Sequence, residues 1–212
     1  MKTLPPDLVR ALPKSEFGKE KVILSDEGAI GEISARFVAM LAPLEEAGKL
    51  GLILFQFPPW FGYSKSNSEH LVRCARLVAP YGIAVEFRNS TWLSPRNFDS
   101  TLSLLRDRRM TYVTADEPQT GANGAIPFLP GVTSDIAYVR FHGRNAVNWS
   151  KKGIPVADRY DYTYGDDELD SFADVVRSLG VQTKATFALF NNCHGAKAIR
   201  NAMELKSKIE GS

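Results

Sequence analysis

Polar side chains that could do chemistry stand at the ends of five short apolar stretches of the chain. In chain order they are Gln56, Glu86, Arg88, Asp116, Arg140, His142, Arg144, Asn191 and Asn192. Successive side chains of a strand point to opposite faces, so Glu86 and Arg88 share one face, as do Arg140 and His142. In a βα barrel the carboxyl ends of the strands carry the active site. We therefore expect these side chains to converge on one cavity.

Three of these residues, His142, Glu86 and Asp116, are predicted to be catalytic because each can exchange a proton. The positive charge of Arg140 disfavours a second charge on His142, which leaves a neutral imidazole able to accept a proton or bind a metal. Glu86 is held ionised by neighbouring arginines, whereas burial has the opposite effect. Its sequence position fits both a general base and a salt-bridge partner.

The remaining residues are predicted to bind substrate. Arg88, Arg140 and Arg144 carry planar guanidinium groups that match the oxygens of a carboxylate or phosphate, so the predicted substrate is a small anion. Neutral hydrogen bonds that orient a substrate or stabilise an oxyanion would come from Gln56, Asn191 and Asn192. An alternative is that the same polar groups pair with one another as buried ions that fix the strand register without catalysis.

Metal binding is a further interpretation, since Glu86, Asp116 and His142 form a set of two carboxylates and one histidine. No short signature such as His-Glu-x-x-His supports it. Neither a Gly-rich dinucleotide fingerprint nor a phosphate loop follows any apolar stretch. The sequence therefore leaves open whether a metal or a cofactor binds. A buried apolar residue is the expected state of Cys193.

Helical and extended patterns alternate along the chain. Apolar residues at helical spacing predict helices over 30–47, 67–79, 99–109, 166–179 and 196–209. Short, almost wholly apolar stretches predict strands over 51–57, 82–87, 111–115, 136–141 and 185–190. This alternation implies right-handed crossovers and a parallel sheet. An open doubly wound sheet with helices on both faces and a closed βα barrel both fit the pattern.

The 212 residues, of which 44% are apolar, predict one α/β domain. Residues 1–29 form an irregular lead in this interpretation, and residues 30–212 form the βα units.

Four motifs in the chain resemble the YecE-like domain-of-unknown-function family. They are LFQFPP at 54–59, VEFRNSTW at 85–92, YVRFHGR at 138–144 and FNN at 190–192. The resemblance runs in order from about Leu41 to Leu205 and implies a TIM-barrel-like fold of eight strands, with no activity to carry over. The family's first three βα units have no counterpart before Ile30. The chain is therefore similar to strands four to eight of that barrel.

Five strands left open would expose two apolar sheet edges. A shortened barrel-like sheet, a wrongly assigned start of the chain and a partner that covers the gap are all consistent with this expectation. Self-association is one way of covering the edges.

Composition limits the classes of partner. The formal charge of +2 gives no field that favours nucleic acid, although a local basic patch leaves that partner open. No apolar run long enough for a membrane anchor or secretion signal appears at the amino terminus, and two distant cysteines suit a reducing compartment. We expect a cytoplasmic protein with no membrane partner.

The leading functional hypothesis is an enzyme, a hydrolase or a lyase, that acts on a small anionic substrate at the carboxyl ends of the strands. His142 or Glu86 would exchange the proton, and the arginines would hold the anion. The competing hypotheses are a noncatalytic module that binds a ligand or nucleic acid, and a truncated, inactive barrel.

Overall fold

The computed structural model describes residues 27–119 and 125–211. Most of the predicted irregular lead, 1–26, lies outside the described residues. The first described helix, α2 (Glu27–Glu46), begins at Glu27, so the assignment of residues 27–29 to the lead is wrong. The apolar periodicity that defined this helix starts at Ile30, and the helix extends about one turn before it.

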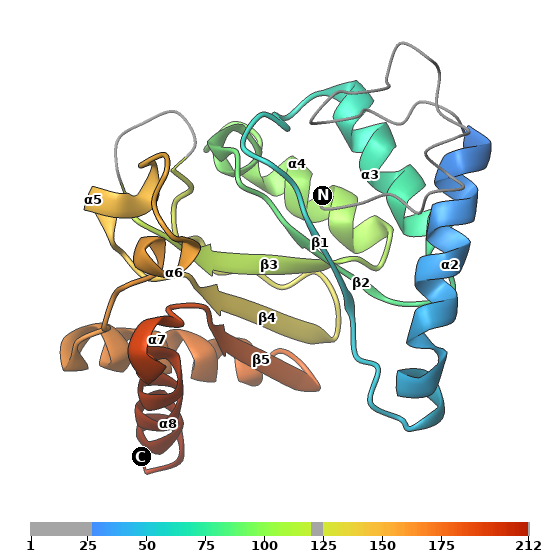
Figure 1. Ribbon diagram of the computed structural model, residues 1–212. Coiled ribbons are helices and arrows are strands. Elements are labelled where there is room, and N and C mark those ends of the chain that lie inside the picture. The colour runs from blue at the N-terminus through green and yellow to red at the C-terminus, as the bar shows by residue number, and fades with distance from the viewer. Residues whose placement is uncertain (1–26, 120–124, 212) are drawn as a thin grey trace. The chain divides into compact units, whose positions relative to one another are not determined.

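Five strands form one parallel sheet in the order β1-β2-β3-β4-β5 (Figure 1). The strands are β1 (Ile53–Gln56), β2 (Ile83–Glu86), β3 (Thr111–Asp116), β4 (Ile136–Phe141) and β5 (Ala185–Phe190). Each lies within one or two residues of its predicted position. The predicted α/β class with a parallel sheet is confirmed.

Each of the remaining helices follows a strand in the chain. They are α3 (Lys65–Leu77), α4 (Phe98–Asp107), α5 (Ala146–Trp149), α6 (Val156–Arg159), α7 (Asp166–Gly180) and α8 (Lys197–Glu210), with 3-10 turns η2 (Ser90–Leu93) and η3 (His194–Ala196). The four long ones confirm the helical periodicity. The short helices and turns, all at the carboxyl ends of strands, were not predicted because a single turn has no periodicity to detect.

The described chain groups into two compact units. One contains α2 together with Arg73–Tyr81, and within it Arg73 forms an ion pair with Glu27 at 2.8 Å. The other contains Leu52–Val72 and the chain from Gly82 onward, including the whole sheet. All residues of the candidate site belong to the second unit.

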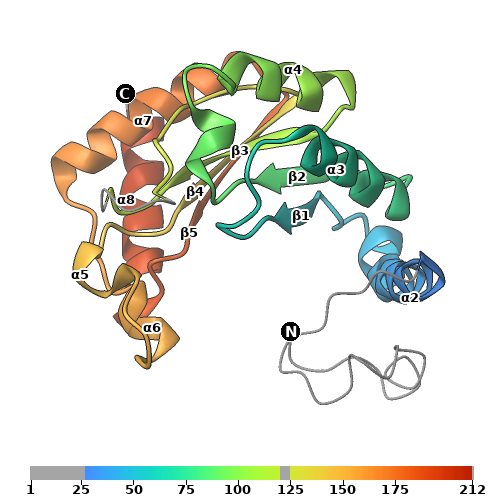
Figure 2. The ribbon, with the colours of Figure 1, turned by 90° about the horizontal axis from the view of Figure 1, so that it is seen from above.

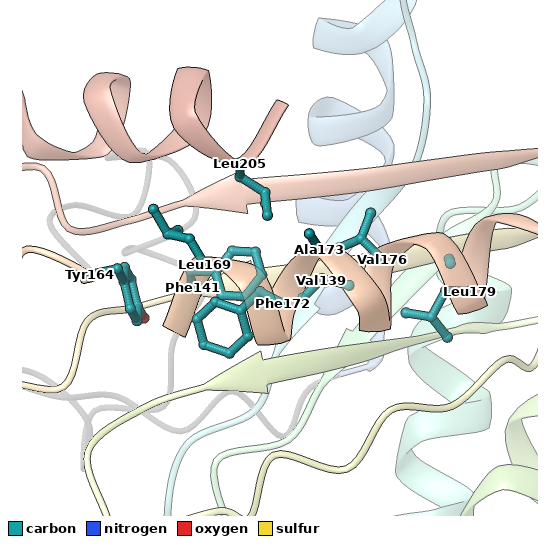
Figure 3. Close-up of a cluster of buried hydrophobic side chains, with 10 residues drawn as sticks. Val139, Phe141, Tyr164, Leu169, Phe172, Ala173, Val176, Leu179 and Leu205 are labelled. Atoms are coloured by element: carbon teal, nitrogen blue, oxygen red, sulfur yellow. The ribbon is translucent and has the colours of Figure 1, made fainter. Parts of the chain in front are cut away.

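Within the sheet-containing unit, α4, α7 and α8 pack against one face of the sheet (Figure 2). Ala137, Val139 and Phe141 of β4 point to this face and are buried beneath α7 and α8 (Figure 3). The opposite face includes Phe187 and Leu189 of β5, which are 43% and 39% exposed. Covering by helices on one face is the arrangement of a partial βα barrel and not of a doubly wound sheet.

None of the helices in the described ranges is both long enough and apolar enough to cross a membrane.

Candidate functional site

Glu86, the last residue of β2, is the centre of a buried polar cluster. Its carboxylate oxygen Oε1 accepts hydrogen bonds from Gln56 Nε2 at 2.6 Å and Arg88 Nη1 at 3.1 Å. The same oxygen lies 3.0 Å from His142 Nε2, and Oε2 accepts a hydrogen bond from Arg140 Nη1. Glu86 itself is 0% exposed. A fully buried carboxylate thus joins residues from β1, β2 and β4.

The strand register explains how residues of β2 and β4 meet across β3. Gln56 is paired with Glu86 in the parallel ladder, and Arg140 is paired with Ala115 of β3. Paired residues of neighbouring strands point to the same face, so Ala115 lies beside Arg140 on the site's face. Because the alanine side chain is a single methyl group, it leaves room for Glu86 to reach the side chains of β4.

Glu86 is ionised in this setting. Burial opposes the charge, but the hydrogen bond with His142 and the guanidinium groups of Arg140 and Arg88 outweigh burial and hold the pKa of Glu86 well below its usual range. An ionised carboxylate is common to a general base and a salt-bridge partner, so the choice between these two roles stays a prediction. Glu86 is an acceptor of hydrogen bonds, not a proton donor.

His142 follows β4 and is 1% exposed. Burial lowers its pKa, and Arg88 and Arg140 act in the same direction against the favourable charge of Glu86. The imidazole is therefore neutral near pH 7. An ionised Glu86 can only accept, so the 3.0 Å contact assigns the proton of the neutral ring to Nε2, which donates to Glu86 Oε1; Arg88 Nη1, itself a donor, lies farther from the same nitrogen, at 3.4 Å. The unprotonated Nδ1 faces the side-chain amide of Asn191, which donates to it at 3.3 Å.

Arg88 connects the cluster to a second buried carboxylate, Glu117. Its Nη2 lies 2.9 Å from Glu117 Oε2, in an ion pair whose geometry is not that of a hydrogen bond. The backbone N–H of Ile126 donates to Glu117 Oε1 at 3.0 Å. Burial raises the pKa of Glu117 to about 7, although Arg88 and the hydrogen bond lower it. Glu117 is a titratable site residue that the sequence analysis missed, next to the predicted Asp116.

Two aromatic side chains from the short helices border the cluster. The rings of Trp149 and Tyr160 lie 6.3 and 6.2 Å from the imidazole of His142, centroid to centroid. The guanidinium carbon of Arg88 stands 5.0 Å from the centroid of Trp149. The segment of α5 and α6 therefore contributes to the covering of His142, and access to Nδ1 requires this segment or Asn191 to move.

The structure brings six of the nine predicted residues together. They are Gln56, Glu86, Arg88, Arg140, His142 and Asn191. The other three make different contacts. Asp116 pairs with Phe141 in the ladder, on the face that α7 and α8 cover, and its carboxylate binds Arg144. Asn192 is fully buried, and its amide donates to Tyr162 O and to Asn201 Oδ1.

The metal interpretation required the side chains of Glu86, Asp116 and His142 to meet. Asp116 points to the opposite face from Glu86, and the described residues contain no group of three histidine, cysteine or acidic side chains suited to a metal ion. The structure offers no set of ligands for a metal within these ranges.

Two further sequence positions lie outside the cluster. Cys193 is exposed, so the expectation of a buried cysteine is wrong; it lies in the turn after β5, where the strand's burial has ended. His194 Nδ1 lies 3.2 Å from Asp161 Oδ1, and Lys197 pairs with the same carboxylate.

Comparisons with known proteins are consistent with this description. Residues 19–212 match the family described as "Protein of unknown function DUF72", to which the YecE-like name also refers. The chain is 35% identical over 182 residues to the UPF0759 protein YunF of Bacillus subtilis. This match covers 84% of the chain and 64% of YunF.

Crystal structures of two DUF72 family proteins are similar to the chain. The protein from Thermotoga maritima is 36% identical with a TM-score of 0.76, and the match covers 85% of this chain and 65% of that one. The protein from Enterococcus faecalis is 30% identical with a TM-score of 0.81, covering 92% and 70%. The chain thus spans about two thirds of the length of these relatives. The correspondence to strands four to eight stays a prediction.

Proposed function

Since the chain belongs to the DUF72 family of proteins of unknown function, we propose from the site itself that it is an enzyme acting on a small anionic substrate, with His142 as the acid/base. The observation that carries the proposal is the hydrogen bond of 3.0 Å between the buried, ionised Glu86 and the neutral His142. A carboxylate that fixes one imidazole nitrogen as a donor leaves the other as a proton acceptor.

The proton acceptor is Nδ1 of His142. Its present partner is the amide of Asn191 at 3.3 Å, near the upper limit for a hydrogen bond, so the contact is weak enough for a substrate group to replace. Glu86 would then stabilise the imidazolium that forms when His142 takes up a proton. Glu86 would act by orienting and stabilising His142 and would not exchange the proton itself.

Arg140 and Arg88 are the residues that would bind the anion. Arg140 is 13% exposed, and its buried Nε has no hydrogen-bond partner among the described residues. Glu86 neutralises only one of the two guanidinium charges, so an anion at this position is electrostatically favourable when Glu117 is protonated. Arg144, with two carboxylate partners, is less suited to this role than the sequence suggested.

A screen of small molecules against thermal stability would test the anionic class of substrate. The panel pairs phosphorylated and carboxylated metabolites with their neutral analogues, because a ligand at about 100 times its Kd adds about 2.7 kcal/mol to stability. We expect a shift with an anion that is lost in Arg140→Lys and retained in Arg96→Lys, an exposed arginine of the same unit. Equal shifts with neutral analogues would contradict the proposed class.

Turnover of such a hit would then test His142. His142→Gln should bind the ligand with a similar thermal shift but lose turnover by roughly 10²- to 10⁴-fold, the usual contribution of an acid/base group. Full activity in His142→Gln would rule out the acid/base role.

A noncatalytic binding module is the second candidate, and the pairing of Glu86 with both Arg88 and Arg140 favours it. Such a network also fixes the register of the strands. In that case the same ligand should bind to the wild-type chain and be recovered chemically unchanged after prolonged incubation.

A further inference from the structure

A second polar network lies on the helix-covered side of the sheet, next to His142 in the chain; Asp116 and Tyr164 are buried in it, whereas Arg144 and Glu168 are partly exposed. Asp116 accepts hydrogen bonds from Arg144 Nη2 at 2.6 Å and from the hydroxyl of Tyr164 at 2.7 Å. Arg144 Nη1 donates to Glu168 Oε1 at 2.8 Å, and the hydroxyl of Tyr162 donates to the same carboxylate. Every member of this network therefore has an oppositely charged or hydrogen-bonding partner.

The network contacts the backbone at Gly143, the residue after His142. The Gly143 N–H donates to the hydroxyl oxygen of Tyr164 at 2.7 Å. Gly143 has a φ of +85°, and a Cβ at this position would lie 2.8 Å from Cβ of Tyr162. On its other side, the N–H of His142 donates to the carbonyl of Asp116 at 2.9 Å. Both peptide groups that flank the His142 side chain are thus held by hydrogen bonds.

Asp116 fixes which atom donates in each of the two hydrogen bonds of the Tyr164 hydroxyl. Its carboxylate accepts the hydroxyl proton of Tyr164, so a lone pair of the hydroxyl oxygen is directed to the Gly143 N–H. Tyr164 is 2% exposed, and burial, with the charge of Asp116, raises its pKa, which keeps the phenol protonated. The hydroxyl therefore connects the Asp116 carboxylate to the Gly143 peptide through two hydrogen bonds, which we call the relay.

We propose that Tyr164, oriented by Asp116, is a positioning residue that sets the direction of the His142 imidazole through the Gly143 peptide. The inference rests on the proposed function of His142 and deepens it. It also gives Asp116 a new role, as an orienting group behind the site and not as a proton-transfer group within it.

The ring of Tyr164 is also part of the aromatic core, so the role of its hydroxyl has to be tested separately from the packing of its ring. Its ring lies 5.9 Å from Phe141, 5.4 Å from Phe172 and 5.8 Å from Phe190, centroid to centroid. A phenylalanine at position 164 makes the same ring contacts and lacks only the hydroxyl. The change Tyr164→Phe therefore removes the relay and retains the core.

The test is the protonation state of His142 in solution. The chain has three histidines, so long-range ¹H–¹⁵N spectra of the imidazole rings can be assigned with His70→Gln and His194→Gln. In the wild type we expect one neutral tautomer for His142, with the proton on Nε2. In Tyr164→Phe the imidazole is held less firmly against Glu86, so the tautomer with the proton on Nδ1 should become detectable, and the pKa of His142 should change with it.

Tyr162→Phe is the matched control, because it removes a hydroxyl from the same network that binds Glu168 and not Gly143. Its His142 signals should match those of the wild type. Unchanged His142 signals in folded Tyr164→Phe would overturn the proposal, as would equal changes in both variants. If Tyr164→Phe does not fold, Asp116→Ala, which removes the acceptor of the Tyr164 hydroxyl, should produce the same change in the tautomers, and wild-type signals in that variant would overturn the proposal.

The spectra do not depend on a substrate, so the two proposals can fail separately. A tautomer change in Tyr164→Phe together with full turnover in His142→Gln would contradict the acid/base function and leave the positioning contact intact. Loss of turnover in His142→Gln with unchanged spectra in Tyr164→Phe would support the acid/base function and contradict the positioning role of Tyr164.

Discussion

At the scale of single residues, the site is governed by a carboxylate that is both buried and charged. Removing one partner of a buried ion pair leaves the other charge uncompensated, which costs far more than the loss of an exposed pair. Glu86 is 0% exposed and has two arginine partners that are 14% and 13% exposed. Its contribution to stability should therefore stand out among the acidic residues of the chain.

The change Glu86→Gln tests this contribution, because it preserves the shape of the side chain and removes its charge. We expect a loss of about 3–5 kcal/mol in the free energy of unfolding, measured with denaturant at neutral pH. Asp174→Asn is the control: it removes an exposed pair with Arg177, and the expected change is below about 0.5 kcal/mol. Equal effects of the two changes would mean that the buried cluster is worth no more than a surface pair.

Glu117 makes stability depend on pH with a sign opposite to that of Glu86, because the pKa of Glu117 is raised in the fold and that of Glu86 is lowered. Its pKa is raised from 4.5 to about 7 in the fold, so the folded state holds a proton that the unfolded chain has already released. The stabilising contribution is complete below pH 4.5 and is lost as the pH rises through about 7.

Glu117→Gln should therefore gain stability relative to the wild type as the pH is raised, by up to about 3 kcal/mol between about pH 5 and about pH 8. Denaturant unfolding of both proteins across this range measures the difference. Asp167→Asn, at an exposed position on α7, should run parallel to the wild type. A constant difference between Glu117→Gln and the wild type would show that Glu117 does not titrate in this range.

At the scale of elements, α7 holds the carboxyl end of β4 in place. Phe172 of α7 is 2% exposed, and its ring lies 4.5 Å from that of Phe141, the last residue of β4 and the neighbour of His142. The aromatic core shown in Figure 3 lies on one face of the strand and supports the polar cluster on the other face.

Phe172→Ala should cost about 3–5 kcal/mol in the free energy of unfolding, because the buried ring leaves a cavity that its neighbours cannot fill. Val181→Ala, at a position that is 87% exposed just after α7, should change it by less than about 0.5 kcal/mol. A cost for Phe172→Ala as small as that of the control would indicate that α7 is not packed on β4 in solution.

At the scale of the whole molecule, β5 has both an apolar face and a sheet edge without a partner strand in the described residues. Phe187 and Leu189 are half-exposed, and the six residues of β5 carry no charge. Apolar uncharged edges of this kind tend to pair with other chains. We expect the isolated chain to self-associate through this edge.

Sedimentation velocity over a range of protein concentrations would detect that association. Phe187→Lys places a charge on the exposed face of β5 and should shift the protein toward monomer, while Val181→Lys, at an exposed position outside the sheet, should not. A wild-type chain that stays monomeric at every concentration would contradict the expectation.

The sequence by itself determined the five strands and the helices α3, α4, α7 and α8, with their ends placed within two residues. Helical and extended periodicities are local properties of the chain, so strands such as Ile136–Phe141 were predicted to the residue. The alternation of side chains also placed Arg140 and His142 on one face correctly, because that rule needs only one strand.

Only the tertiary structure decided which residues of different strands meet. Register is a long-range property, and it turns Asp116 toward α7 and α8, while the small side chain of Ala115 lets Glu86 reach Arg140 and His142. The protonation states followed from the same contacts, since burial and nearby charge oppose each other at Glu86 and Glu117 and only distances decide the balance. The chemistry was visible in the residues, but its division between two faces of the sheet depended on the fold.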